Sequence, residues 1–328
     1  MRKQPVKVGI IGSAGYTGGE LIRLLLNHQS AEIVFAHSES NGGNLISDVH
    51  LDLLGETDLR FSDSLTQDVD VLFLCVGHGN ARKFLTNHKI SETTRIIDLS
   101  QDFRLKENAR FKEREFIYGL PELQRTAIES ARNIANPGCF ATTIELALLP
   151  LAQKNLIRSE IHVNATTGST GAGQNPSPTT HFSWRNNNLS AYNIFQHRHL
   201  AEIGEVLSQP SGIVPQVNFI PQRGNFPRGI FATNYLKSDL SLEDAYELYE
   251  TYYAEHPFTH VSRKNIDLKQ VVNTNKSLLH LVKHESVLLI ISMTDNLLKG
   301  ASGQAVQNMN LMFGLDEKTG LNLKSIVY

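Results

Sequence analysis

The feature that most constrains the fold is a glycine turn near the N-terminus, between an apolar strand and an apolar helix. Residues 6–11 (Val-Lys-Val-Gly-Ile-Ile) have the composition of a buried strand, and residues 19–27 have the apolar spacing of a helix. The turn between them carries Gly12, Gly15 and Gly18. Such a turn binds a pyrophosphate, because glycines let the backbone approach it and the helix N-terminus supplies N–H groups. The segment therefore predicts a dinucleotide-binding domain.

Strands and helices continue to alternate through the first half of the chain. Residues 32–37, 70–76 and 95–99 are apolar runs of strand length. This alternation is typical of an α/β fold with a Rossmann-type doubly wound parallel sheet. In such a fold the glycine turn and the ends of the next strands face the cofactor. The predicted cofactor-binding residues of this half are Gly12, Ser13, Gly15, Tyr16, Thr17, Gly18, Ser38 and Gly77.

The end of the second strand, where the adenosine ribose is expected, leaves the choice between NAD and NADP open. Glu39 favours NAD, because its carboxylate accepts a hydrogen bond from a ribose hydroxyl. Ser38, Ser40 and Asn41 favour NADP instead, because their side chains can hydrogen-bond a 2′-phosphate. These residues alone do not decide between the two.

Cys139 is the candidate nucleophile. It follows Asn136, Pro137 and Gly138, and it begins a predicted helix that runs to about residue 154. The helix dipole and the unpaired N–H groups of the first turn favour the thiolate. The alternative is a buried structural cysteine. The Pro-Gly turn and the histidines downstream favour the nucleophile.

His197, Arg198 and His199 open another predicted helix and supply candidate acid–base and anion-binding groups. A histidine would deprotonate the thiol and then exchange a proton with the thiohemiacetal oxygen. With a dinucleotide domain, these groups predict a Cys139 thioester that exchanges a hydride with a nicotinamide. His197 is expected nearer the thiol and His199 nearer the substrate, although the residues leave open which one transfers the proton.

The second half of the chain has a different pattern, which predicts a mixed or antiparallel sheet with a few helices. Its strand-like segments are residues 161–167, 214–220, 229–236, 278–284 and 287–293. Between the first two of these lies a long polar stretch, residues 174–188, whose length suggests a functional loop.

Composition excludes several classes of function. With 31 basic and 33 acidic residues, the net charge of -2 offers no bulk attraction to nucleic acid or to an anionic membrane. No apolar run approaches the roughly 20 residues that span a bilayer. The 2 cysteines cannot form a disulfide framework, and no Cys/His cluster has metal-ligand spacing. Without a signal-peptide pattern, a cytoplasmic location is expected.

Motifs along most of the chain resemble those of the N-acetyl-gamma-glutamyl-phosphate reductases of arginine biosynthesis. The matching segments are residues 12–21, 98–105, 118–122, 136–139, 171–173, 197–199 and 299–310. The resemblance implies NADPH, an N-acyl-gamma-glutamyl phosphate substrate, and a semialdehyde plus phosphate as products. It also implies an α+β second domain like that of aspartate-semialdehyde and glyceraldehyde-3-phosphate dehydrogenases, and a homodimer or homotetramer.

The resemblance also assigns residues and domains. Its nucleophile corresponds to Cys139 and its histidine pair to His197 and His199, with Glu202 as an orienting carboxylate. It adds Gly171 and Asn308 to the predicted cofactor site. The predicted substrate ligands are Arg104, Asn136, Arg198 and Arg228. The predicted domains are an NADP-binding domain (1–150), a substrate and dimerisation domain (151–298) and a C-terminal helix that returns to the first domain (299–328).

Two alternatives remain open at this point. An aspartate-semialdehyde dehydrogenase would share the fold and the thioester mechanism, but the His-Arg-His triplet at 197–199 favours the glutamyl enzyme. A non-enzymatic nucleotide sensor would use the same first domain, but it leaves Cys139 without a task. Assays with both semialdehydes separate the first alternative, and thiol labelling at mildly acidic pH separates the second.

The identity of the acyl group is also open. The sequence departs from the family pattern at Gln174, at residues 183–186 and at residues 221–229, and the last two segments add Arg185 and Arg223. Extra positive charge beside a substrate pocket predicts a further anion, which an N-succinyl group has and an N-acetyl group lacks. The alternative is that both arginines are solvated loop residues.

Overall fold

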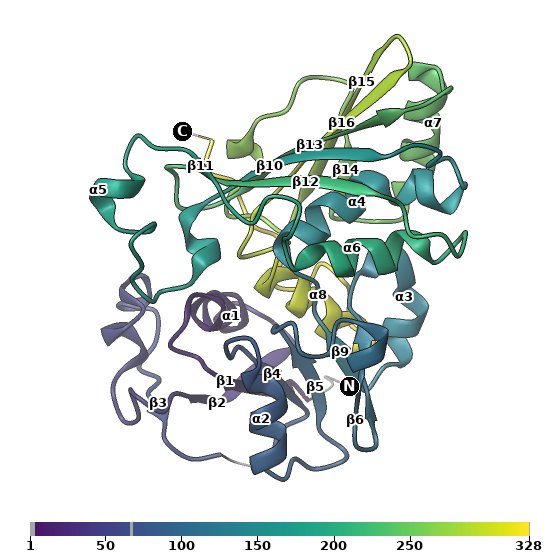
Figure 1. Cartoon of the computed structure of the whole chain (residues 1–328). Coiled ribbons are helices and arrows are strands. Elements are labelled where there is room, and N and C mark those ends of the chain that lie inside the picture. The colour runs from purple at the N-terminus through teal and green to yellow at the C-terminus, as the bar shows by residue number, and fades with distance from the viewer. Residues whose placement is uncertain (1–3, 66–67, 328) are drawn as a thin grey trace. The chain divides into compact units, whose positions relative to one another are not determined.

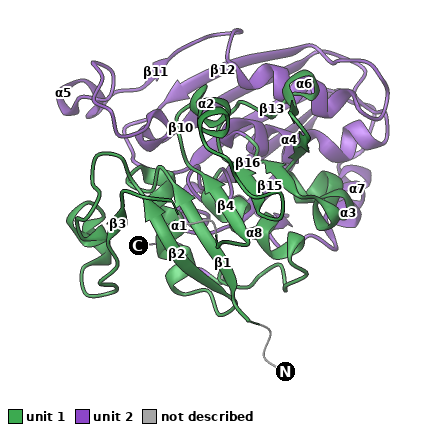
Figure 2. Ribbon diagram, turned by 90° about the horizontal axis from the view of Figure 1, so that it is seen from below, with its two compact units in different colours: residues 1–137, 301–322 green, residues 138–300, 323–328 purple. Residues whose placement is uncertain are grey.

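The computed structural model describes residues 4–65 and 68–327 and divides into two compact units (Figures 1 and 2). Unit 1 is Met1–Pro137 with Ala301–Asn322, and unit 2 is Gly138–Gly300 with Leu323–Tyr328. The predicted domain boundary after residue 150 falls inside helix α4 (Cys139–Gln153). The structure divides the chain before α4 because this helix is buried along nearly its whole length against the sheet of unit 2.

Unit 1 contains a seven-stranded sheet in the order β3-β2-β1-β4-β5-β9-β8. All its neighbouring strands are parallel. This strand order confirms the predicted doubly wound fold. The strands are β1 (Val6–Ile11), β2 (Ala31–His37), β3 (Phe61–Ser62), β4 (Val71–Leu74), β5 (Arg95–Asp98), β8 (Ile117–Tyr118) and β9 (Asn133–Ala135).

The helices of unit 1 are α1 (Tyr16–Leu26), α2 (Asn80–Asn87), α3 (Pro121–Ser130) and α8 (Ser302–Met312). Helix α8 packs against α1 and α3, and all of its residues are buried. The hydroxyl of Ser302 donates to the backbone oxygen of Thr17, 2.8 Å away. The C-terminal helix is thereby fastened to the helix that follows the glycine turn.

Unit 2 contains a seven-stranded mixed sheet in the order β11-β12-β10-β13-β16-β15-β14. Helices α4, α6 (His199–Ser208) and α7 (Leu242–Tyr253) pack on this sheet. Side chains along β13 alternate between buried and half-buried, as in a sheet that is covered more fully on one face. The strands are β10 (Ile161–Thr167), β11 (Ser190–Ala191), β12 (Val217–Arg223), β13 (Ile230–Lys237), β14 (Thr259–Val261), β15 (Ser277–His284) and β16 (Val287–Thr294).

Short elements complete the chain. They are β6 (Arg110–Phe111), β7 (Arg114–Glu115), α5 (Phe182–Arg185) and the 3₁₀ turns Ile46–Asp48, Leu51–Leu53, Lys106–Asn108, Ser169–Ala172 and Leu268–Gln270. The strand predicted at 214–220 begins three residues later, because Pro215 has no N–H for the ladder. The same strand extends to Arg223. Across the described residues, no helix is long and apolar enough to cross a membrane.

Candidate active site

The predicted glycine turn follows β1 in unit 1 and has the geometry of a phosphate cradle. Gly12 has a φ of +75°, and a Cβ built on it would lie 2.6 Å from the backbone oxygen of Cys75, so no other residue fits. Helix α1 begins after Gly15, whose position has no side-chain cap. The first N–H groups of α1 therefore lack an intrahelical acceptor, which suits an anionic group.

The end of β2 gathers hydroxyl groups next to this turn. The backbone oxygen of His37 accepts the Ser13 hydroxyl at 2.8 Å and the Ser13 N–H at 3.1 Å, which fixes the turn to β2. Just beyond His37, the Asn41 side-chain amide donates to the hydroxyl oxygens of Ser38 at 3.2 Å and Ser40 at 3.0 Å. Glu39 is exposed.

A second cluster in unit 1 joins α8 to the segment before Cys139. The Asn308 amide nitrogen donates to the Gly119 oxygen at 2.9 Å and to the Asn136 side-chain oxygen at 3.1 Å. Its own amide oxygen is buried and has no hydrogen-bond partner among the described residues. A buried oxygen that accepts no hydrogen bond suits a ligand that supplies a hydrogen-bond donor.

Two predicted substrate ligands belong to the same cluster. The Arg104 Nε donates to the Asn136 backbone oxygen at 2.9 Å, and the Asn136 amide donates to the Ala301 oxygen at 3.0 Å. Both side chains are buried and hold this part of unit 1 together. Of the predicted cofactor residues, Gly77 lies exposed after β4, and Gly171 belongs to unit 2.

Cys139 is the first residue of α4 in unit 2, as predicted. It is partly accessible. The N–H of Gly138 donates to one carboxylate oxygen of Glu202, 3.0 Å away, so the start of α4 is tied to α6. The other cysteine, Cys75, has the same intermediate exposure as a residue, but its thiol is desolvated, which raises the pKa of that thiol to about 12.

A glycine of unit 2 packs directly against the candidate nucleophile. A Cβ built on Gly300 would lie 2.8 Å from both the Cβ of Cys139 and the backbone oxygen of Asn296. The Gly300 N–H donates to the Asp295 oxygen at 2.9 Å. Arg228 holds this turn with two hydrogen bonds of 3.1 Å to the buried Asp295 carboxylate. Arg228 therefore has a structural task here, and its role as a substrate ligand stays a prediction.

The two histidines lie against the residue that follows Cys139. The ring centroid of Phe140 is 5.4 Å from that of His197 and 6.3 Å from that of His199. The backbone N–H of His199 donates to Nδ1 of His197 at 3.2 Å, which places the proton of a neutral His197 on Nε2. Burial and the Arg198 charge lower the pKa of His197 to about 4. At neutral pH this ring is therefore an uncharged donor.

His199 and Glu202 form the other half of the histidine cluster. Nε2 of His199 lies 3.9 Å from the second oxygen of Glu202, and both side chains are buried. Unit 2 thus brings together all four predicted catalytic residues, Cys139, His197, His199 and Glu202. Arg198, the predicted substrate ligand between the histidines, is exposed.

Comparisons with known proteins match both halves of the chain. Residues 7–131 match the "Semialdehyde dehydrogenase, NAD binding domain", and residues 139–296 match the "Semialdehyde dehydrogenase, dimerisation domain". The N-acetyl-gamma-glutamyl-phosphate reductase of Azobacteroides pseudotrichonymphae genomovar. CFP2 is 61% identical, with 98% of this chain and 99% of that protein covered. That of Bacteroides thetaiotaomicron is 58% identical, with 97% and 98% covered. The chain belongs to the N-acetyl-gamma-glutamyl-phosphate reductase family.

Membership in this reductase family makes the protein an oxidoreductase with a nicotinamide-binding domain, so the nucleotide-sensor alternative is wrong. Among solved structures, aspartate semialdehyde dehydrogenase II from Vibrio cholerae has a TM-score of 0.72 at 17% identity, covering 95% of this chain and 99% of that one. This likeness confirms the predicted fold of the α+β second domain.

Tyr192 is an aromatic residue of the candidate site that the sequence does not mark. Its ring centroid lies 5.8 Å from that of His197. Burial, and the nearby Cys139 thiolate, raise the pKa of its phenol to about 12. The guanidinium carbon of Arg223 lies 4.7 Å from the centroid of the same ring. No motif marks a single tyrosine in a polar loop, so only the folded chain identifies it.

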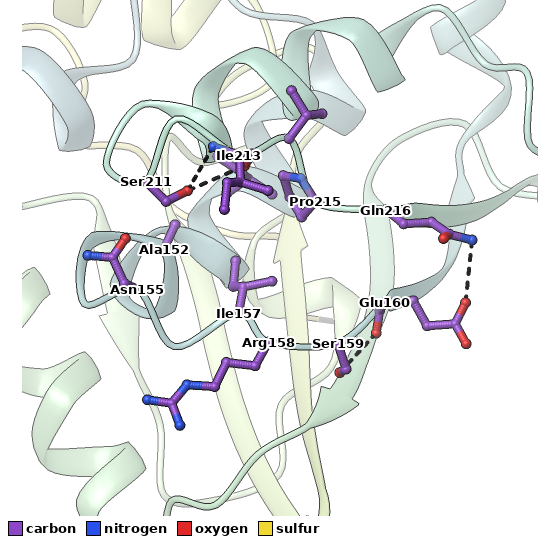
Figure 3. Close-up of a pocket in the computed structure, with 12 residues that line it drawn as sticks. Ala152, Asn155, Ile157, Arg158, Ser159, Glu160, Ser211, Ile213, Pro215 and Gln216 are labelled. Atoms are coloured by element: carbon purple, nitrogen blue, oxygen red, sulfur yellow. Dashed lines mark hydrogen bonds between the residues drawn. The ribbon is translucent and has the colours of Figure 1, made fainter.

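A pocket of about 550 Å³ in unit 2 lies apart from these groups (Figure 3). Ala152 and Leu207, near the C-terminal ends of α4 and α6, help to line it. Since α4 has 15 residues, this pocket lies roughly 20 Å along the helix from Cys139. None of the described residues that line it is a cysteine or a histidine. We place the candidate site at the N-terminal end of α4 instead.

Proposed function

We propose that the protein reduces an N-acyl-gamma-glutamyl phosphate to N-acyl-glutamate 5-semialdehyde and inorganic phosphate, with NADPH, in arginine biosynthesis. The observation that carries this proposal is the 61% identity to a reductase of this name over 98% of the chain. The cluster of Cys139, His197, His199 and Glu202 in unit 2 supports it, because a thiol and buried imidazoles suit acyl transfer.

In the proposed first step the Cys139 sulfur attacks the γ-carbonyl carbon of the acyl phosphate. A carbon–sulfur bond forms, the carbon–oxygen bond to phosphate breaks, and phosphate leaves with that electron pair. The position of Cys139 at the start of α4 supports this role, because the helix N-terminus favours a thiolate. In the second step the thioester is reduced, and the thiohemiacetal releases the aldehyde and regenerates the thiolate.

The two histidines are proposed to divide the proton chemistry. Neutral His197 donates a hydrogen bond from Nε2 to the substrate oxygen as negative charge develops there. His199, which Glu202 orients, accepts the thiol proton, returns a proton to the thiohemiacetal oxygen and removes it again as the aldehyde is released. This division exchanges the roles of the two histidines relative to the expectation from the sequence. The low pKa of His197, about 4, supports a donor that stays uncharged throughout.

The cofactor is proposed to be NADPH. The turn from Gly12 to Gly18 and the start of α1 would hold the pyrophosphate, and Ser38, Ser40 and Asn41 would hold the 2′-phosphate. When bound, the reduced nicotinamide supplies the hydride. The exposure of Glu39 supports NADPH over NADH, since its carboxylate can turn to solvent. A higher kcat/KM with NADH would contradict this choice. Gly77, Gly171 and the buried Asn308 oxygen stay predicted cofactor contacts.

A homodimer or homotetramer in the cytoplasm completes the proposal. The match of residues 139–296 to a dimerisation domain supports association through unit 2. The half-buried Phe231, Thr233 and Tyr235, which alternate with buried residues along β13, provide one suitable face. Light scattering of the purified protein tests this, and a monomeric mass at micromolar concentration would contradict it.

The decisive assay runs the reaction in reverse. Reduction of NADP⁺ is followed with an N-acyl-glutamate semialdehyde and, in parallel, with aspartate semialdehyde, each with and without phosphate. We expect turnover with the N-acyl-glutamate semialdehyde only, and only when phosphate is present, because phosphate must cleave the thioester. Turnover with aspartate semialdehyde instead would replace the proposed function by the alternative that shares the fold.

A further inference from the structure

The two arginines in the segments that depart from the family pattern, Arg185 and Arg223, have opposite environments. Arg185 is buried, and its guanidinium makes five hydrogen bonds, to Thr179 O (3.2 and 3.1 Å), Asn188 O (3.2 Å), Arg223 O (2.5 Å) and Ser190 Oγ (3.0 Å). An arginine has five N–H groups, so all are in use. Arg185 therefore has no free N–H for a substrate anion, and because it is buried it is not a solvated loop residue either. Its side chain organises the loop.

Arg223 lies beside the loop of residues 179–190 that Arg185 holds together. It ends β12, where its backbone pairs with Ser190 of β11. Its guanidinium lies over the Tyr192 ring, and Nη1 makes a long 3.4 Å contact with the Thr179 hydroxyl. Its Nε is buried and has no hydrogen-bond partner in the described part of the chain. No carboxylate within residues 4–65 and 68–327 forms an ion pair with it.

The half-buried Arg223 side chain thus lacks both an acceptor for Nε and a carboxylate to balance its charge. A buried N–H without an acceptor costs about 1–3 kcal/mol, and more when the group is charged. A carboxylate resolves both deficits at once, since it accepts two parallel N–H bonds from the guanidinium edge. The environment of Arg223 thus matches a carboxylate ligand.

The position of Arg223 relates this ligand to the reaction. Tyr192 links Arg223 to the histidine cluster. The Arg223 guanidinium lies over the Tyr192 ring, and the same ring also lies against His197. The Cys139 thiolate acts electrostatically on the same tyrosine. The cation and His197 therefore lie against the same aromatic ring. When the γ-carbon of the substrate is at Cys139, the parts of the substrate that extend away from the reacting carbon are its amino-acid end and the acyl group on its nitrogen.

We infer that Arg223 binds a carboxylate at the far end of the N-acyl group, so the enzyme takes a dicarboxylic acyl group such as N-succinyl. An N-acetyl group ends in a methyl and leaves the buried Nε of Arg223 without an acceptor, which discriminates against it. This inference rests on the proposed function and specifies its substrate. The competing assignment, to the α-carboxylate, predicts no acyl preference.

The test compares kcat/KM for N-succinyl- and N-acetyl-glutamate semialdehyde in the unmodified enzyme and in Arg223→Gln. We expect the unmodified enzyme to prefer the succinyl substrate by roughly 10- to 100-fold. In Arg223→Gln the succinyl value should fall by a similar factor, while the acetyl value stays within about threefold. Arg223→Lys keeps the charge without the paired donors and should fall between the two.

Arg263→Gln is the matched control, because Arg263 also lies over a tyrosine, 4.6 Å from the Tyr246 ring centroid, but has Glu243 and Glu250 as partners. It should leave the acyl preference unchanged. Thermal shifts with N-succinylglutamate and N-acetylglutamate give a readout that needs no turnover. Equal kcat/KM for the two acyl groups, or an equal loss of both in Arg223→Gln, overturns the inference and leaves the proposed function standing. Turnover of neither substrate, with aspartate semialdehyde active, overturns both.

Discussion

The two units build their sites from different materials. In unit 1 the proposed cofactor cradle is backbone: Gly12 provides the turn, and α1 begins without a side-chain cap. In unit 2 the proposed chemistry is carried by side chains at and just before the starts of α4 and α6, namely Cys139, His197, His199 and Glu202. A backbone site is sensitive to added atoms, whereas a side-chain site is sensitive to changes in proton affinity. The predictions below test this difference.

The largest effect is expected at the nucleophile of unit 2. Cys139→Ser should lower kcat by more than about 10³-fold, because a hydroxyl ionises far less readily than a thiol. Cofactor binding in unit 1, measured by NADPH fluorescence, should survive. Cys75→Ala is the control and should retain activity, since desolvation raises the pKa of that thiol to about 12 and keeps it protonated. Activity above a few per cent in Cys139→Ser would sink the thioester mechanism.

The next effect concerns the histidine pair. His197→Asn and His199→Asn should each lower kcat, the more important one by roughly 10²-fold. Because the pKa of His197 is about 4, the loss in His197→Asn should be the same at pH 6 and pH 8. A pH–rate profile of each variant checks this. A loss that appears only on one side of pH 6.5 would show that His197 titrates during catalysis.

A smaller effect is expected from one added methyl group in unit 1. Gly12→Ala should lower the free energy of unfolding by about 2–3 kcal/mol and weaken NADPH binding, through backbone strain and a clash with Cys75. Gly314→Ala is the control, because its φ is +63° but nothing lies within 4 Å of the new Cβ. Equal effects of the two changes would show that φ alone matters, and that the close approach at Gly12 does not.

The smallest effect is a pH dependence of stability that comes from unit 2. His197 has an ordinary pKa of 6.5 when unfolded and about 4 when folded. Its stabilising contribution is present above pH 6.5 and is lost as the pH falls towards 4. Between pH 7 and pH 5 the protein should lose about 1–2 kcal/mol from this group. In His197→Asn, the free energy of unfolding, measured by thermal unfolding, should fall less between pH 7 and pH 5 than in the unmodified protein. In His181→Asn, a change at an exposed histidine, it should fall as much as in the unmodified protein. Identical slopes in all three proteins would refute the assignment.

The same difference explains how much of the molecule is predictable from sequence. Gly12 and Gly15 report a backbone conformation within a few residues of themselves, so the doubly wound fold and its turn are predictable. Cys139 is predictable because Pro137 and Gly138 mark its helix start locally. These signals need no knowledge of distant contacts.

Features that depend on distant partners are not predictable in this way. The boundary at residue 137 follows from which sheet α4 packs against, and an apolar helix sequence does not specify that sheet. The sequence leaves open whether Arg185 binds an anion or is a solvated loop residue, because nothing local shows that carbonyls at 179, 188 and 223 converge on it. Tyr192 is noticed only once Arg223 and His197 are on either side of it.

The saturated guanidinium of Arg185 has a consequence for how substrate preference can evolve. The Arg185 guanidinium donates to the main-chain oxygen of residue 223, and Ser190 of β11 pairs with the main chain of the same residue. Neither interaction depends on which side chain position 223 carries. Position 223 therefore accepts different side chains without loss of these main-chain bonds, so on the inference above a single substitution there would change acyl selectivity and keep the fold. Such a substitution is a short evolutionary route to a different acyl group.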